Sequence, residues 1–143
     1  MSYITQTKEI GSQTKAKETK VNGISVANLI KSEEAIKDDG RLAKFNFRAK
    51  GKWIKGAHNQ VTINDLYGGC QTHGRSPPFV YEMEEPPVLL CEDVGANPSE
   101  YALAVLNGCL MSNFVFLASA LGVKIEGIES TLSGDLDAQG TLG

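Results

Sequence analysis

The sequence has no excess of positive charge, no apolar leader and no internal repeat. Its formal net charge is −3 at pH 7, so it offers no polybasic surface and we expect no nucleic-acid partner. The first residues contain no apolar stretch of the kind that directs secretion, and we therefore expect a cytoplasmic protein. A chain of 143 residues without a repeat is expected to form one domain with a modest hydrophobic core.

Cysteine and histidine are scarce, and their spacing excludes the common metal sites. The three cysteines, Cys70, Cys91 and Cys109, cannot all pair within one chain, so free thiols in a reducing compartment are expected. Their separations match no zinc-ligand pattern, and only His58 and His73 could add ligands. We expect neither a metal nor another bound cofactor. No catalytic triad, phosphate-binding loop or carboxylate pair is visible.

Charge is also missing from one long stretch of the chain. Between Glu100 and Lys124 there is no charged residue, and apolar side chains recur on every face at helical spacing. Such a helix is buried either in a protein core or in a membrane. Four polar residues interrupt this stretch, namely Asn107, Ser112, Asn113 and Ser119. Because of these interruptions, and because no second span is present, we predict a core helix and no membrane partner.

Both ends of this helix, within residues 96–123, carry clear local signals. Asn97 suits the N-cap, Pro98 suits the first helical position, and Glu100 stands where its carboxylate can bond back to the cap. Gly122 suits the left-handed conformation that ends many helices. The sequence therefore predicts a long helix around which the rest of the chain is organised.

The remaining segments predict an α+β fold with an antiparallel sheet. Residues 1–20 are polar and lack an apolar period, so we expect a flexible arm before a domain at 21–143. A short amphipathic helix is expected to begin near Ser25. Apolar and polar residues alternate in four segments that we predict as strands, starting at 43 and at 61, and covering 77–83 and 125–136. A turn is expected at 51–56 and a loop at 66–75.

A helix that is apolar all round has more surface than the three short strands before it can cover. The chain also ends soon after the fourth predicted strand begins. Either a partner chain covers the helix, or a further C-terminal part does so. We expect a homodimer in which the long central helix is buried.

Cys109 lies near the middle of this helix and is the candidate reactive group. A thiol reacts as thiolate, which a nearby cation or a helix N-terminus favours, but Cys109 lies about three turns into the helix. Glu100 lies nine residues earlier, on roughly the opposite face, so the two would not touch within one chain. They could belong to one site across an interface, or with Glu100 steering a basic side chain. Four earlier residues could supply the cation, namely Arg48, Lys52, Lys55 and Arg75. The alternative is that Cys109 is a small buried apolar residue.

The helix carries two segments that resemble a known family signature. Asn97-Pro98-Ser99-Glu100-Tyr101, followed by Leu106-Asn107-Gly108-Cys109-Leu110, resembles the signature of the OsmC/Ohr family, the osmotically inducible protein C and organic hydroperoxide resistance proteins. That signature is Asn-Pro, an acidic residue, and then the peroxidatic cysteine inside the central helix. Segments 43–49, 84–90 and 129–137 are similar to a bacterial OsmC-like subgroup. The resemblance covers roughly residues 20–143.

The resemblance implies an OsmC-like α+β fold, an intertwined homodimer and a role in oxidative-stress defence. Its members reduce organic hydroperoxides with a peroxidatic cysteine, here Cys109, at the dimer interface. An acidic residue at the helix start and a cation from the first hairpin hold the thiolate; here these are Glu100 and Lys52. A second cysteine resolves the sulfenic acid, and an external dithiol restores the enzyme, so no bound cofactor is implied.

Three features differ from the family pattern. The C-terminal segment that carries the resolving cysteine is missing from the sequence, Ser99 stands where the family has its glutamate, and Lys52 stands for an arginine. A one-cysteine peroxidase that depends on an external thiol is therefore expected. Its pocket would be lined by Leu106, Leu110, Phe114 and the partner subunit. The alternative is a non-catalytic dimer that binds a small apolar molecule or acts as a scaffold.

Overall fold

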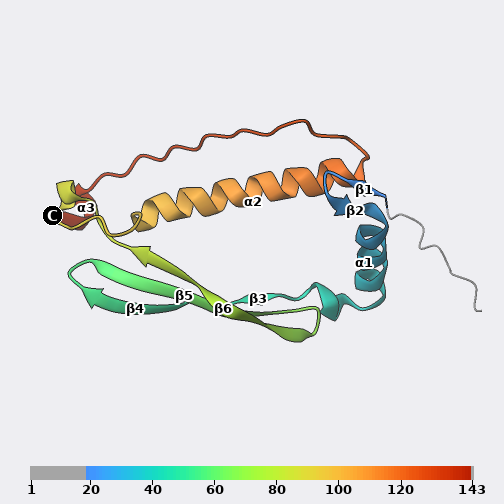
Figure 1. Cartoon of the computed structure of the whole chain (residues 1–143), viewed down its shortest axis with the longest axis horizontal. Helices are drawn as coiled ribbons and strands as arrows, with labels where there is room; N and C mark the ends of the chain where they lie inside the picture. Colours follow the sequence, from blue (N-terminus) through green and yellow to red (C-terminus); the bar gives the residue numbers. More distant parts are fainter. Residues whose placement is uncertain (1–18, 143) are drawn as a thin grey trace, which may run out of the picture.

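The computed structural model describes residues 19–142 and shows an α+β fold (Figure 1). The elements, in chain order, are β1 (Lys20–Val21), β2 (Ile24–Ser25), α1 (Val26–Asp38), the 3-10 helix η1 (Gly40–Ala43), β3 (Asn46–Phe47), β4 (Lys50–Lys55), β5 (His58–Gly68), β6 (Gln71–Met83), the 3-10 helix η2 (Pro87–Leu89), α2 (Pro98–Ala120) and α3 (Gln139–Leu142). The predicted α+β class is confirmed. The predicted flexible arm lies, apart from its last two residues, outside the described part of the chain.

β5 is the central strand of an antiparallel four-stranded sheet. β6 pairs with β5 along one edge, from Asn59 opposite Met83 to Gly68 opposite Gln71. β3 and β4 pair with successive parts of β5 on its other edge. The tip of the β5–β6 hairpin contains only Gly69 and Cys70, both with positive φ, as in the two-residue turns that suit twisted hairpins.

The strands extend beyond the predicted ones. Residues 66–75, predicted as a loop, belong mostly to β5 and β6, and residues 51–55 of the predicted turn belong to β4. Glycine in these segments suggested loops. The chain turns instead at only two residues in each hairpin, because the long cross-strand pairing outweighs the weak strand propensity of single glycines.

Both predicted helices form, and they begin where the capping signals place them. The Ser25 side chain accepts a hydrogen bond from the Asn28 N–H at 3.1 Å, and α1 extends to Asp38. At the start of α2, the Asn97 side chain accepts from the Ser99 N–H, and Glu100 accepts from the Asn97 N–H at 2.9 Å. This is the reciprocal capping box that the sequence predicts.

A turn near the N-terminus holds the far end of α2. The Asn22 amide donates to the Ser119 hydroxyl at 3.1 Å and to the Val123 carbonyl at 2.9 Å, and it accepts from the Ile125 N–H. Ser119 is fully buried beneath this turn. The β1–β2 hairpin thus fixes the C-terminal end of the long helix through polar contacts.

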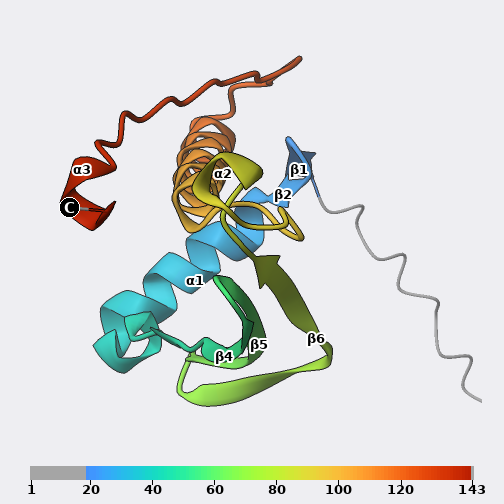
Figure 2. The ribbon, with the colours of Figure 1, turned by 90° about the vertical axis from the view of Figure 1, so that its left-hand side faces the viewer.

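The prediction that α2 is buried is wrong for the single chain. Only Ala118 and Ser119 of its 23 residues are buried. α2 lies between the sheet on one side and the extended segment 123–138 on the other, and neither covers it closely (Figures 1 and 2). Six of its large apolar side chains remain exposed, namely Val105, Leu106, Leu110, Phe114, Phe116 and Leu117.

The predicted fourth strand at 125–136 is also absent from the described chain. This segment runs back along α2 without regular structure and is tied to it by hydrogen bonds between Asn107 and Ser130 (Figure 1). A strand needs unpaired backbone groups beside it, and the backbone groups of a helix are already paired. The alternating pattern alone therefore forms no strand here.

Candidate functional site

Cys109 is exposed on α2, and its sulfur accepts a hydrogen bond from one neighbouring side chain. The side-chain amide of Asn113, one helical turn further on, lies 3.4 Å from the Cys109 sulfur and also donates to the Cys109 carbonyl at 2.9 Å. The thiol is thus accessible on an otherwise apolar helix and faces a polar N–H. The expected pocket residues Leu106, Leu110 and Phe114 lie on the adjacent face of α2, each about half exposed.

An apolar cavity ends about one helical turn before this thiol along α2. It has a volume of about 340 Å³ and is formed between the sheet and the first turns of α2. Its lining residues are Val61, Ile63, Tyr81, Met83, Pro98, Tyr101, Ala102 and Val105. Ala102 and Val105 precede Cys109 by seven and four residues, so all three lie on one face of the helix. The sequence did not indicate this cavity, because its walls come from strands distant along the chain.

Glu100 and Lys52, the other two predicted site residues, do not reach the thiol within one chain. The Glu100 carboxylate caps α2, about 13 Å along the helix axis from Cys109 and on the opposite face. Lys52 is exposed on β4, opposite Gln60 of β5. Within residues 19–142 no hydrogen bond or ion pair connects Lys52, Glu100 and Cys109. The single chain therefore presents the thiol without its expected partners.

The other candidate cations already have neighbours. Lys55 contacts both carboxylate oxygens of Glu92 at 2.7 Å, which raises the pKa of Lys55 and lowers that of Glu92. Arg48 pairs with Asp65 at 2.8 Å. Arg75 lies over the ring of Phe79 and forms no ion pair in the described part of the chain.

A polar network that the sequence did not reveal joins the sheet to the start of α2. Gln60 donates to Glu82 at 2.7 Å, and the His58 ring lies 2.8 Å from the other Glu82 oxygen. These two bonds, the Gln60 bond foremost, lower the pKa of Glu82. The Tyr101 hydroxyl donates to the Glu82 carbonyl at 3.1 Å. The side chain of His58 is only 12% exposed.

The segment between β6 and α2 is held by two further carboxylates. Glu84 is 3% exposed and accepts a hydrogen bond from the Val94 N–H at 3.0 Å. Glu85 accepts from the Asn97 side chain, the same side chain that caps α2. The run of acidic residues before Pro86 thus positions the helix that carries Cys109. Within the described range no three metal-binding side chains lie together.

α2 is long and apolar enough to cross a membrane, judged by length and composition alone. A core helix of a soluble protein passes the same test, so this property does not choose between the two environments. Comparison with models of known protein families finds no match, and comparison with curated proteins finds none either.

Proposed function

We propose that this protein is a thiol peroxidase that reduces organic hydroperoxides through Cys109. The observation that carries the proposal is an exposed thiol with an amide donor, placed one helical turn beyond a 340 Å³ apolar cavity. A hydroperoxide with an apolar body can occupy such a cavity while its O–O group lies at the sulfur. The resemblance of the α2 segments to the OsmC/Ohr signature supports the same chemistry.

The functional unit is a homodimer with an OsmC-like intertwined arrangement. Six large apolar side chains of α2 are half or more exposed in the single chain, for example Val105 at 69% and Leu117 at 62%. Exposed apolar surface of this extent is typical of an interaction site, which we assign to a protein–protein contact. A second copy is the partner proposed, because the signature around Cys109 belongs to a family of homodimers. The three free cysteines suit a reducing, cytoplasmic compartment.

The reaction balances with one thiol and two external reducing thiols. The Cys109 thiolate attacks the terminal peroxide oxygen, an S–O bond forms, the O–O bond breaks, and the alkoxide takes a proton and leaves as an alcohol. Cys109 is thereby oxidised to a sulfenic acid. An external thiol condenses with it, releasing water and forming a mixed disulfide. A second thiol then attacks this disulfide and restores Cys109.

Glu100 and Lys52 act from across the interface in this proposal. In one chain they lie away from Cys109, so the partner subunit must supply them to the site. Lys52 would attract the thiolate, and Glu100 would orient that ammonium group. This arrangement makes the peroxidase activity depend on dimer formation.

Peroxide consumption tests the proposal. The reduced full chain receives a slight excess of cumene hydroperoxide or hydrogen peroxide, with a sulfenic-acid trap present, and is followed by intact mass. We expect rapid trapping at Cys109 with the organic peroxide and slower trapping with hydrogen peroxide. Cys109→Ser should abolish consumption, while Cys70→Ser and Cys91→Ser should not change it. Unchanged consumption by Cys109→Ser would reject the proposal.

A non-catalytic dimer that binds a small apolar molecule is the second candidate. The observation that favours it is the absence of Lys52 and Glu100 from the surroundings of Cys109 in the described chain. It predicts slow and equal modification of all three cysteines by both peroxides. The same mass experiment therefore separates the two functions.

A further inference from the structure

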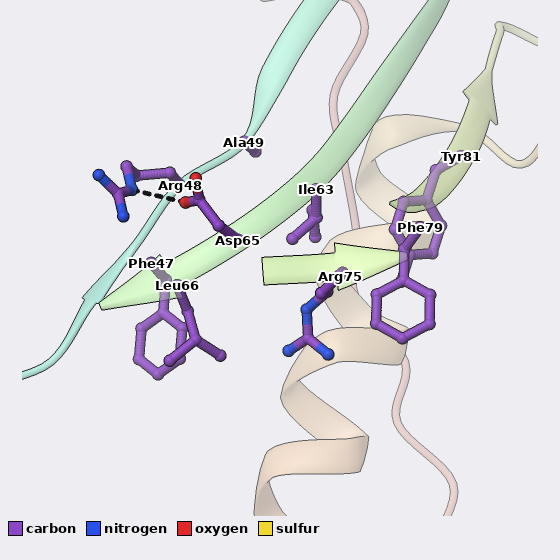
Figure 3. Close-up of a pocket in the computed structure, with 9 residues that line it drawn as sticks. All are labelled: Phe47, Arg48, Ala49, Ile63, Asp65, Leu66, Arg75, Phe79 and Tyr81. Atoms are coloured by element: carbon purple, nitrogen blue, oxygen red, sulfur yellow. Dashed lines mark ion pairs between the residues drawn. The ribbon is translucent and has the colours of Figure 1, made fainter. Parts of the chain in front are cut away.

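A second cavity lies on the sheet, adjoins the first at Ile63 and Tyr81, and holds an arginine without an acidic partner in the described chain. Its volume is about 330 Å³. Phe47, Leu66, Arg75 and Phe79 extend from their strands to the same side of the sheet (Figure 3). The side chains of Phe47 and Phe79 are 74% and 49% exposed, which is unusual for two large rings in one depression. The cavity thus combines apolar walls with a single polar centre.

Arg75 is arranged to receive an anion. Its guanidinium carbon lies 4.7 Å from the centroid of the Phe79 ring. The Arg75 guanidinium lies over the face of the ring, and its N–H edge can bond a carboxylate in a bidentate manner. No hydrogen bond or ion pair within residues 19–142 occupies that edge. The ring therefore orients the charged group without neutralising it.

The charges in the cavity add up to one uncompensated positive charge. Arg48 also lines the cavity, but its Nε lies 2.8 Å from Asp65 Oδ1, so these two charges cancel. Arg75 alone remains. A ligand with one negative charge balances it, whereas a phosphate monoester would leave negative charge against apolar walls.

We propose that this cavity binds a small amphipathic monocarboxylate, with its carboxylate on Arg75 and its apolar body between Phe47 and Phe79. The volume lies at the lower end of the range for small-molecule pockets, which suits a single ring or a short alkyl chain. The site uses none of Cys109, Glu100 and Lys52, so it stands whether or not the chain is a peroxidase.

A titration with 4-phenylbutyrate, followed by NMR at the Phe47 and Phe79 amides of the full chain, tests this site. The neutral 4-phenylbutyramide has the same apolar body and should bind at least about tenfold more weakly, because it lacks the charge-assisted bonds. Arg75→Gln should weaken binding of the acid by a similar factor. Arg41→Gln removes an exposed guanidinium outside the cavity and should change nothing.

A variant that gains affinity keeps the test independent of folding defects. Asp65→Asn releases Arg48 and adds a second positive charge, so the acid should bind more tightly and the amide equally well. Cys109→Ser should bind the acid as the unmodified chain does. Any one of three results would overturn the proposal. The first is the absence of a saturable shift, which is expected if a second copy covers the face. The second is equal binding of the acid and the amide, and the third is binding like that of the parent chain by both Arg75→Gln and Asp65→Asn.

Discussion

At the scale of single residues, the segment between β6 and α2 depends on close backbone contact. Gly95 lies directly against the Glu82 carbonyl, where an added Cβ would clash with backbone atoms. Glu82 in turn accepts hydrogen bonds from Gln60 and Tyr101. Two residues that are distant in the sequence, one without a side chain and one charged, thus fix the start of the long helix together.

We predict that Gly95→Ala destabilises the protein by about 1–3 kcal/mol, because the chain must shift to admit the methyl group. Urea unfolding followed by circular dichroism measures this difference. Gly127→Ala is the matched control, since a Cβ there meets nothing within 4 Å. Equal stability of both variants would show that the contact between Gly95 and Glu82 is not close in solution.

The hydrogen bonds of Glu82 also make the stability of the protein depend on pH. Its hydrogen bonds from Gln60 and His58 lower its pKa below the ordinary 4.5. The stabilisation that these hydrogen bonds give the folded protein is therefore complete above pH 4.5. It is lost as the pH falls through the lower pKa that Glu82 has in the folded state. Glu82→Gln should reduce the fall of the urea midpoint between pH 5 and pH 3. Glu129→Gln, which removes an exposed carboxylate that forms no bond in the described chain, should leave this fall unchanged.

At the scale of elements, local signals predicted the helices, whereas strand pairing needed information from elsewhere in the chain. Ser25 and Asn97 mark the helix starts because a cap acts within three residues of itself. Residues 125–136 alternate like a strand, yet they lie beside α2, which has no free backbone groups to offer. The positions of Glu82 and His58 were equally hidden, because the β5–β6 pairing that joins them depends on residues more than twenty apart.

The surroundings of Gly108, within α2, permit a test of whether this helix is covered. In the single chain a Cβ at Gly108 meets nothing within 4 Å. Gly108→Ala should then stabilise the helix by about 0.5–1 kcal/mol through its better helix propensity. In a dimer with close packing beside Cys109, the added methyl group should instead destabilise the folded dimer. Unfolding at a low and a high protein concentration distinguishes these two outcomes.

At the scale of the whole molecule, the single chain leaves its most apolar element exposed. Leu110 and Phe114 of α2 are 54% and 56% exposed, and only Ala118 forms an apolar core among the described residues. Such a chain buries too little apolar surface to be stable alone. The sequence predicts that the helix is buried, and the described chain alone does not bury it.

We predict that the protein is a dimer whose association depends on the exposed face of α2. Leu110→Asp and Phe114→Asp place a charge on this face, and a dimer would have to bury that charge without a partner, which costs free energy. The molecular mass in light scattering should therefore fall from that of two chains towards that of one. Val88→Asp is the matched control, because Val88 is 84% exposed but lies in η2. If the dimer supplies Lys52 and Glu100 to Cys109, the monomeric variants should also lose peroxidase activity while keeping Cys109. A monomeric parent chain, or α2 variants that remain dimeric, would show that another surface or another segment covers the helix.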